Sequence, residues 1–145
     1  MISLIAAIGK NGELGKNNAL IWNLPGDLKF FREKTTDHSI VMGLNTYLSI
    51  GKALPKRRNI VISKGNSINN ENIIIYNDIN ELISNELNNE EENFIIGGAS
   101  LYNYFYPLAD RMYLTLIDAE DKDADTYFPK INDNVWKQTT LAKNE

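Results

Sequence analysis

The sequence contains no cysteine, and this absence excludes several kinds of chemistry. Without a thiol the chain has no disulfide, no thiolate nucleophile and no cysteine ligand for a metal ion. Histidine is almost as scarce, because His38 is the only one. It stands in a predicted loop and has no other candidate metal ligands at a suitable spacing in the sequence. A nucleophile–histidine–acid triad is therefore not expected.

Positive charge is not in excess either, since the 145 residues carry a net charge of −4. This balance gives no indication of a nucleic-acid-binding surface. The apolar run at residues 2–8 is far too short for a membrane span and lacks a basic leader, so it predicts a buried strand, no membrane partner and a cytoplasmic location. The length fits one domain, which we expect to span residues 1–145.

Short apolar runs alternate with amphipathic segments along most of the chain. We expect strands at residues 2–8, 39–43, 58–63, 72–76, 93–98 and 111–118, and a weaker one at 135–141. We expect helices at residues 25–34, 45–51, 78–87 and 99–109, and a long loop at 9–22. The order predicts the α/β class: a single domain with a mostly parallel central β-sheet flanked by helices.

An acidic residue stands in the stretch "WNLPGDLKFF", residues 22–31. Helical spacing puts Asp27 on the same face as Phe30 and Phe31. One interpretation is that Asp27 complements the dipole of the helix from its first turn. The other is that Asp27 faces an apolar cleft, where it would hold an amidine-like ring edge through two parallel hydrogen bonds. Both interpretations stay open at this point.

Glycines follow two of the predicted strands at the edge where ligands bind in open α/β sheets. In "IIGGASLY" the backbone at Gly97 and Gly98 can approach a ligand closely, and a helix start follows. In "MGLNTY" the side chains of Asn45 and Thr46 are capping or phosphate-binding donors. Neither stretch is the GxGxxG fingerprint of dinucleotide-binding domains, and an ordinary strand–helix turn is the alternative for both.

Three consecutive basic residues, Lys56, Arg57 and Arg58, precede the third strand. Such a triplet is usually a solvated turn. If Arg57 points into the cleft instead, its guanidinium is suited to bind a carboxylate through two hydrogen bonds. Together with the glycines and Asp27, it indicates a site for a phosphate-bearing cofactor and an acidic substrate.

The stretch "DKDADT", residues 121–126, resembles the opening of a calcium-binding loop. Thr126 stands where such a loop needs glycine, and Asn132 where it needs glutamate. We therefore expect no metal site.

Four stretches together resemble the bacterial chromosomal type of dihydrofolate reductase. They are "WNLPGDLKFF", "MGLNTYLSIGKALPKRRNIVIS", "FIIGGASLY" and "MYLTLIDAE" followed by "DTYFP", in that order and at the spacing of the family. The resemblance covers about residues 1–136. It implies an oxidoreductase of one-carbon metabolism that reduces dihydrofolate to tetrahydrofolate with a hydride from NADPH, and that antifolate inhibitors bind.

The resemblance implies catalytic roles for Asp27, Trp22 and Thr115. Asp27 would bond to the pterin and favour protonation of its ring, with a water held near Trp22. The implied substrate-binding residues, which include a carboxylate-binding Arg57, are Ile5, Asp27, Leu28, Phe31, Arg32, Ile50, Lys52, Leu54, Arg57 and Thr115.

The same resemblance implies a cofactor site with a cis peptide bond between Gly97 and Gly98 and a mobile loop over the nicotinamide. The implied cofactor-binding residues are Ala7, Glu13, Leu14, Gly15, Lys16, Asn18, Ala19, Asn45, Thr46, Ser63, Lys64, Ile96, Gly97, Gly98, Ala99, Ser100, Leu101 and Tyr102.

The chain departs from the family pattern in two places. Leu44 stands where many relatives have an arginine for the extra phosphate of NADPH, and Lys64 is a candidate replacement. The last antiparallel strand of the family is missing after Glu145, so the strand at residues 111–118 is expected at an open sheet edge. We expect a monomer, with this edge as the place for any self-association.

Two alternatives to the reductase stay open. One is a related pterin or pyrimidine reductase of the same fold, against which the acid after "WNLP" argues. The other is a protein that binds folate or a nucleotide without turnover.

Overall fold

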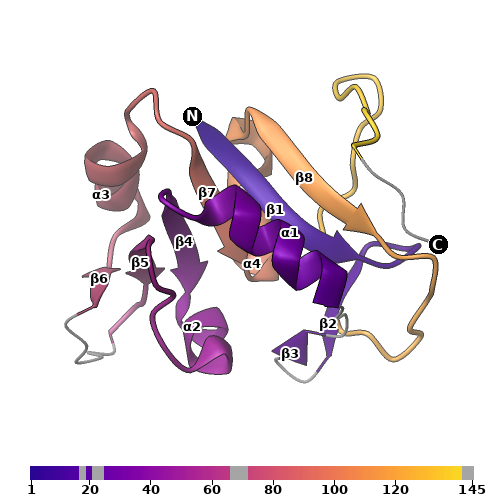
Figure 1. Cartoon of the computed structure of the whole chain (residues 1–145), viewed down its shortest axis with the longest axis horizontal. Coiled ribbons are helices and arrows are strands. Elements are labelled where there is room, and N and C mark those ends of the chain that lie inside the picture. Colours follow the sequence, from indigo (N-terminus) through magenta and orange to yellow (C-terminus); the bar gives the residue numbers. More distant parts are fainter. Residues whose placement is uncertain (17–18, 21–24, 66–71, 142–145) are drawn as a thin grey trace.

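The computed structural model describes residues 1–16, 19–20, 25–65 and 72–141. A six-stranded sheet forms its centre, with strand order β6-β5-β4-β7-β1-β8 (Figure 1). All five pairings within this sheet are parallel, as the sequence predicts. The strands of the sheet are β1 (Ile2–Ile8), β4 (Ser39–Gly43), β5 (Arg58–Ile62), β6 (Ile73–Tyr76), β7 (Asn93–Gly97) and β8 (Arg111–Leu116).

The central strands are apolar on both faces because helices cover both faces of the sheet. Successive residues of a strand point to opposite faces, so neighbours such as Leu4 and Ile5 belong to two separate apolar clusters. Phe94 and Ile95 divide between the same two clusters, and both are fully buried.

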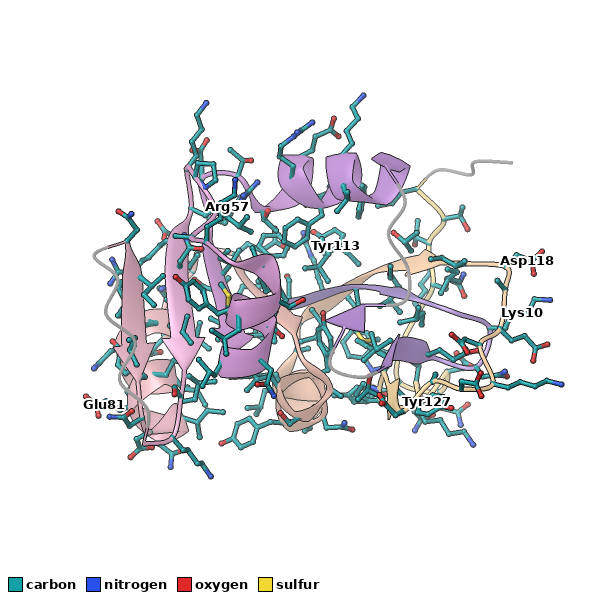
Figure 2. The ribbon with its side chains drawn as sticks, turned by 90° about the horizontal axis from the view of Figure 1, so that it is seen from below. Lys10, Arg57, Glu81, Tyr113, Asp118 and Tyr127 are labelled. Carbon is teal, nitrogen blue, oxygen red and sulfur yellow. The ribbon has the colours of Figure 1, made fainter. Side chains whose placement is uncertain are left out.

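The helices are α1 (Pro25–Thr35), α2 (Leu44–Ile50), α3 (Ile79–Leu82), which continues as the π-helix η1 (Ile83–Leu87), α4 (Ala99–Phe105) and the 3-10 helix η2 (Tyr106–Leu108). Phe30 and Phe31 of α1 pack on the cluster of Ile5, whereas Leu82 of α3 and Phe105 of α4 belong to the other cluster. Figure 2 shows α1 on one side of the sheet and α4 on the other. In the described part of the chain, no helix has the length and apolar character needed to cross a membrane.

Local sequence accounts for several helix ends. Asp78 caps α3, since its carboxylate accepts a hydrogen bond of 2.8 Å from the backbone N–H of Asn80. Gly51 ends α2 in the left-handed conformation, with a φ of 86°, and its N–H donates to the carbonyl of Tyr47 at 2.9 Å. Gly51 thereby turns the chain into the loop at residues 52–57.

The segment predicted as one loop at residues 9–22 contains short strands instead. Here β2 (Glu13–Lys16) pairs with β3 (Ala19–Leu20) and with β9 (Thr126–Tyr127) in a three-stranded antiparallel sheet. The prediction missed the pairing of β2 with β9, which lies more than a hundred positions away in the chain. Local sequence carries no signal for such a pairing.

The prediction of a strand at residues 135–141 is wrong. Residues 132–136 form a turn in which the N–H of Asn134 donates to the side chain of Asn132 at 3.0 Å, and no strand follows up to residue 141. Val135 is 73% exposed, so the apolar residues of this stretch have no sheet to pack on. In the described residues, β8 lies at the edge of the large sheet with β1 as its one neighbour, as the sequence predicts.

Candidate active site

Two glycines form a close-packed corner at the end of β7. The peptide bond between Gly97 and Gly98 is cis, as the family resemblance implies. Gly97 has a φ of 132°, and a Cβ added to it would lie 3.3 Å from Oγ1 of Thr46. A side chain at Gly97 would therefore be strained and would also fill the space beside the Thr46 hydroxyl.

This corner brings together residues from two neighbouring strands. Met42 of β4 pairs with Gly97 of β7, so the starts of α2 and α4 lie at the same edge of the sheet. Within the described residues, neither helix has a hydrogen-bonding side-chain cap. The backbone N–H groups of both starts thus remain available for an anion.

The predicted cofactor residues around this corner differ in exposure. Asn45, Ser100 and Lys64 are exposed, Thr46 and Ala99 are half-buried, and Ser63 is buried at the end of β5. The side chain of Leu101 packs in the core cluster on the face of the sheet that α4 covers. Only the backbone of Leu101 could therefore contact a cofactor. Exposed polar groups around a glycine corner fit the diphosphate of a dinucleotide such as NADPH, because they allow the phosphates to approach the backbone.

Tyr102 connects this corner to the central strand. Its hydroxyl donates a hydrogen bond of 2.7 Å to the backbone carbonyl of Ile5, and the side chain is 4% exposed. The hydroxyl would also lie 3.6 Å from a Cβ at Gly97. Tyr102 therefore fixes the distance between β1 and the glycine corner.

An apolar wall stands on the face of the sheet that α1 covers. It is formed by one cluster in which Ile5 is 4% exposed and Phe31, Ile50 and Leu54 are half-buried. Leu28, on the first turns of α1, is 55% exposed. These are five of the residues for which the resemblance implies contact with the pterin and the ring that follows it.

Thr115 belongs to the same face. It pairs with Ala7 across β1 and β8, while Tyr113, two positions earlier on its strand, packs in the cluster of Ile5. Because residues two apart in a strand share a face, Thr115 is placed on the side of α1, as its predicted role requires.

Arg57 lies at the other end of this wall, near α1 (Figure 2). Its guanidinium carbon is 5.8 Å from the ring centre of Phe31, and Nη2 donates to Oγ1 of Thr36 at 3.4 Å. Its Nε is buried and has no hydrogen-bond partner among the described residues. Burial, followed by the charge of Arg32, lowers the pKa of the Arg57 guanidinium from its ordinary value.

The surroundings of Arg57 favour an anion. An unpaired buried N–H of a charged group is costly, and a second cation close by raises that cost. Arg32 and Lys52, the other cations expected near the substrate, are both exposed. A carboxylate beside Arg57 would satisfy Nε and neutralise part of the charge.

Asn59, which the sequence interpretation passed over, holds the loop that carries Arg57. Its Nδ2 donates to the carbonyls of Leu54 at 2.9 Å and of Arg57 at 3.0 Å, and its Oδ1 accepts from the N–H of Leu54 at 2.9 Å. The side chain is 3% exposed. The available signal was a lone amide in the apolar stretch "RNIVIS".

The base of the predicted mobile loop is fastened to the segment after β8. Glu13 is 1% exposed, and its carboxylate accepts from the N–H groups of Asn11 at 2.7 Å and Asp121 at 2.8 Å. These backbone hydrogen bonds, that of Asp121 first, lower the pKa of Glu13. Leu14 is buried in the core, and the carbonyl of Gly15 accepts from Asp125 at 3.0 Å. The side chains of Glu13 and Leu14 are thus engaged within the protein, and the backbone carbonyl of Glu13 accepts a hydrogen bond of 3.1 Å from the N–H of Gly9.

Several predicted site residues lie outside the described residues. Trp22 and Asn18 are among them, together with the side chains of Lys16, Ala19 and Asp27. The backbone of Asp27 belongs to the first turn of α1.

A hollow formed by described residues has a different lining from this wall. It has a volume of about 770 Å³ and is lined by residues 8–12, 116–118 and 127–131. None of the predicted substrate residues lines it. Its only cation–anion contact in the described part is between Lys10 and Asp118, 3.1 Å apart and largely exposed.

Comparisons with known proteins agree with this geometry. The family model for dihydrofolate reductase matches residues 1–145. The dihydrofolate reductase of Bacillus subtilis is 39% identical over 137 residues, which are 94% of this chain and 80% of the relative. That of Haemophilus influenzae is 41% identical over 135 residues, which are 93% of this chain and 82% of the relative.

A solved structure gives the same result for the fold. The dihydrofolate reductase of Enterococcus faecalis, complexed with NADP(H) and RAB-propyl, matches with a TM-score of 0.86 and 32% identity. The match covers 97% of this chain and 83% of that chain. On sequence, fold and the arrangement of the glycine corner, the chain belongs to the dihydrofolate reductase family.

Proposed function

We propose that this chain reduces dihydrofolate to tetrahydrofolate with NADPH at the edge of the sheet between α1 and the glycine corner. Family membership over the whole chain supports the reaction. The related enzyme of E. faecalis was solved with NADP(H), which supports the cofactor. NADPH, when bound, supplies the hydride, and the protein supplies orientation and electrostatics.

The structural observation that supports the substrate assignment is the hydrogen bonding of Arg57. Its buried Nε has no hydrogen-bond partner among the described residues, beside an apolar wall and a second arginine. Dihydrofolate has a matching shape, with a flat ring system at one end, whose faces can pack on apolar side chains, and carboxylates on a glutamate tail at the other. The wall would bind the rings and Arg57 would bind a carboxylate of the tail.

The cofactor would lie along the edge that contains Gly97, Gly98 and Thr46. The space beside the Thr46 hydroxyl exists because Gly97 has no side chain. We place the diphosphate there, near the start of α4, and the nicotinamide toward the loop at residues 13–20. Asn45, Ser63 and Lys64 are positioned at the neighbouring strand ends for the rest of the nucleotide.

Asp27 is proposed to hold the pterin and to promote its protonation. Its place in the first turn of α1 is next to Leu28 and one turn before Phe31. A carboxylate there would accept hydrogen bonds from the amino group and ring nitrogen of the pterin, and its charge would favour the protonated ring. Thr115 would add a hydrogen bond from β8, and Trp22 would hold the water that carries the proton.

Turnover by the purified protein tests the proposal. With dihydrofolate and NADPH, the near-ultraviolet absorbance of the reduced nicotinamide should fall and tetrahydrofolate should accumulate. The same assay with NADH measures the cofactor preference, for which Leu44 is the relevant departure from the family. Tight binding of both molecules without any turnover would contradict the proposal and favour a binding protein.

Two expectations remain predictions. We expect a monomer, because every proposed site residue comes from one chain, and size-exclusion chromatography with light scattering measures it. We also expect a cytoplasmic location, which fractionation of cells would measure.

A further inference from the structure

We infer that Asn59 is a positioning residue that sets the preference for substrates with an acidic tail. This inference rests on the proposed function, since it concerns how the same site recognises the glutamate part of dihydrofolate. Asn59 acts through the loop that carries Leu54 and Arg57, without touching the substrate.

The first step is the loop itself. Residues 52–57 connect α2 to β5 and contain neither helix nor strand, so their backbone groups need partners from elsewhere. The side chain of Asn59 supplies three of them: it accepts from the N–H of Leu54 and donates to the carbonyls of Leu54 and Arg57. One amide thus holds both the middle and the end of the loop at distances of 2.9–3.0 Å.

The second step is what these two points carry. Leu54 packs on the apolar cluster that forms the wall, and so does Phe31. Arg57 places its guanidinium over the same Phe31 ring. The backbone positions that Asn59 fixes therefore determine the distance from the wall to the cation, which is the distance that a ring system with an acidic tail must span.

The third step is the rigidity of the anchor. Asn59 lies on β5, pairs with Ile40 on one side and Ile73 on the other, and is 3% exposed. A buried amide between two neighbouring strands has little freedom to move. Without it, three partly buried backbone groups would lose their hydrogen-bond partner, and the loop would shift together with Arg57.

The chain offers a matched control in Asn93. This residue is 1% exposed at the start of β7, and its Nδ2 donates to the carbonyls of Met1 and Glu91 and to the side chain of Asn89. It has the same burial and the same kind of bonds to a loop, but none of them reaches Leu54 or Arg57. If the substitutions acted only by lowering the free energy of unfolding, those at Asn59 and Asn93 should have similar effects on the kinetics.

The experiment compares Asn59→Asp with Asn93→Asp on two substrates. One is dihydrofolate, and the other is a methyl-substituted dihydropterin that lacks the glutamate tail. For Asn59→Asp we expect KM for dihydrofolate to rise by about tenfold, which corresponds to about 1.4 kcal/mol. We expect kcat/KM for the tailless substrate, which would contact the wall but not Arg57, to fall by a smaller factor, so that the ratio of the two kcat/KM values changes. KM for NADPH should remain as in the wild type.

Asn93→Asp should leave the ratio of the two kcat/KM values at the wild-type level. Equal loss on both substrates with Asn59→Asp, or the same change of ratio with Asn93→Asp, would overturn the inference. If Asn59→Asp does not fold, Asn59→Ser removes the amide without adding a charge and is measured in the same way.

A double-mutant cycle with Arg57→Leu identifies the route of the effect. If Asn59 acts through Arg57, adding Asn59→Asp to the Arg57→Leu variant should not change the ratio of kcat/KM for dihydrofolate to kcat/KM for the tailless substrate. Full additivity of the two changes would contradict the inference. Failure of the proposed function is distinct, because then the wild type itself would turn over neither substrate.

Discussion

Three consecutive basic residues have three different environments in this structure. Lys56 is exposed with a positive φ of 60°, Arg57 lies over Phe31 with its Nε buried, and Arg58 binds Glu86. The charge that we propose for binding an acidic substrate, that of Arg57, is the one with a buried N–H that has no partner among the described residues. At the scale of a residue, function therefore depends on which polar atoms the fold leaves unsatisfied.

Replacement of Asp27 by asparagine should remove the acid while it keeps the size of the side chain. We expect kcat for dihydrofolate near neutral pH to fall by about 10²-fold or more, within the range typical for lost acid–base catalysis. The free energy of unfolding should be unchanged or slightly higher, because one charge is removed from an apolar face.

Stopped-flow measurement of the hydride step, together with denaturant unfolding of both proteins, checks this prediction. A variant that keeps the wild-type rate across the pH range would show that Asp27 has no part in proton transfer.

A side chain at Gly97 should damage the cofactor corner. In Gly97→Ala the new Cβ would lie 3.3 Å from Oγ1 of Thr46 at a φ of 132°. We expect a loss of about 1–3 kcal/mol in the free energy of unfolding and a weaker affinity for NADPH.

Gly43→Ala is the matched control, because a Cβ there would meet nothing within 4 Å. Its change in unfolding free energy should stay within about 0.5 kcal/mol. Titration of NADPH by fluorescence and urea unfolding measure the two effects, and equal behaviour of both variants would contradict the assignment of the corner.

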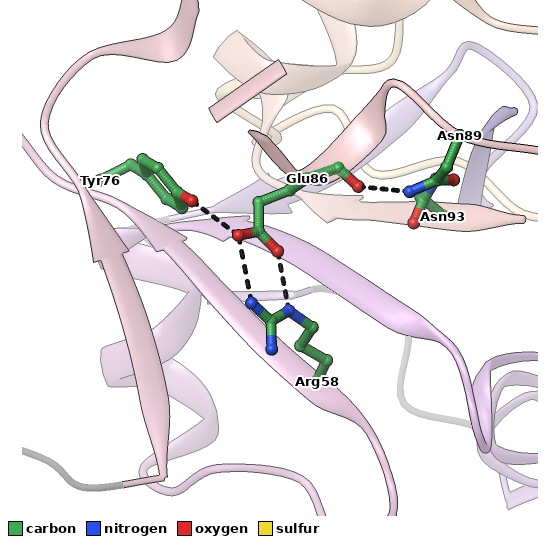
Figure 3. A network of polar contacts seen from close by, with 5 residues as sticks. All are labelled: Arg58, Tyr76, Glu86, Asn89 and Asn93. Atoms are coloured by element: carbon green, nitrogen blue, oxygen red, sulfur yellow. Dashed lines mark hydrogen bonds and ion pairs between the residues drawn. The ribbon is translucent and has the colours of Figure 1, made fainter. Parts of the chain in front are cut away.

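At the scale of elements, one buried carboxylate joins three of them. Glu86 of η1 accepts two hydrogen bonds from Arg58 of β5, at 2.7 and 3.2 Å, and one from Tyr76 of β6 at 2.6 Å (Figure 3). The Arg58 guanidinium, more than any other group, lowers the pKa of Glu86. The same contact with Glu86 raises the pKa of Tyr76, which keeps its hydroxyl protonated as a donor.

The stability that this network provides should depend on pH. A carboxyl group with a lowered pKa stabilises the fold above its ordinary pKa, about 4.3 for glutamate, and this contribution is lost as the pH falls through the lowered value. Glu86→Gln should therefore reduce the free energy of unfolding by about 1–2 kcal/mol at neutral pH, a modest cost because Arg58 is half-exposed. The difference from the wild type should shrink under acid conditions.

Urea unfolding of both proteins over a series of pH values measures this difference. Glu90→Gln, at an exposed position of the loop after η1, is the control that should show no such pH dependence. A difference that grows toward low pH would contradict the role of the ionised carboxylate.

At the scale of the whole molecule, the sheet is most rigid at its centre. The strands β4, β7 and β1 have neighbours on both sides, and Ile40, Phe94 and Leu4 are fully buried in them. In the described residues, β6 and β8 each have a neighbour on one side only, and Leu116 at the end of β8 is 60% exposed.

Amide hydrogen exchange should follow this order. We expect the slowest exchange in β1, β4 and β7 and faster exchange in β6 and β8, because edge strands open at lower free energy. Mass spectrometry or NMR of the native protein in heavy water measures the rates. Amides of β8 that outlast those of β1 would show that the edge is covered in solution.

The sequence interpretation was successful where the signal is local. The apolar run at residues 2–8 predicts β1, and Pro25 predicts the start of α1. It failed at residues 135–141, where apolar and β-branched residues occur without a partner strand. It also passed over the pairing of β2 with β9, whose strands are distant in the sequence, and over Asn59, whose bonds to Leu54 and Arg57 depend on how the loop folds back on β5.

The sequence by itself determined the periodic apolar pattern, the order of the elements, the glycines after β7 and the family resemblance, since these are properties of consecutive residues. Only the tertiary structure decided which arginine of the basic triplet keeps a buried N–H without a partner among the described residues, which amide holds its loop, and that β2 pairs with β9. Burial and hydrogen bonding are properties of neighbours in space, and the chain brings those neighbours together only when the sheet has formed.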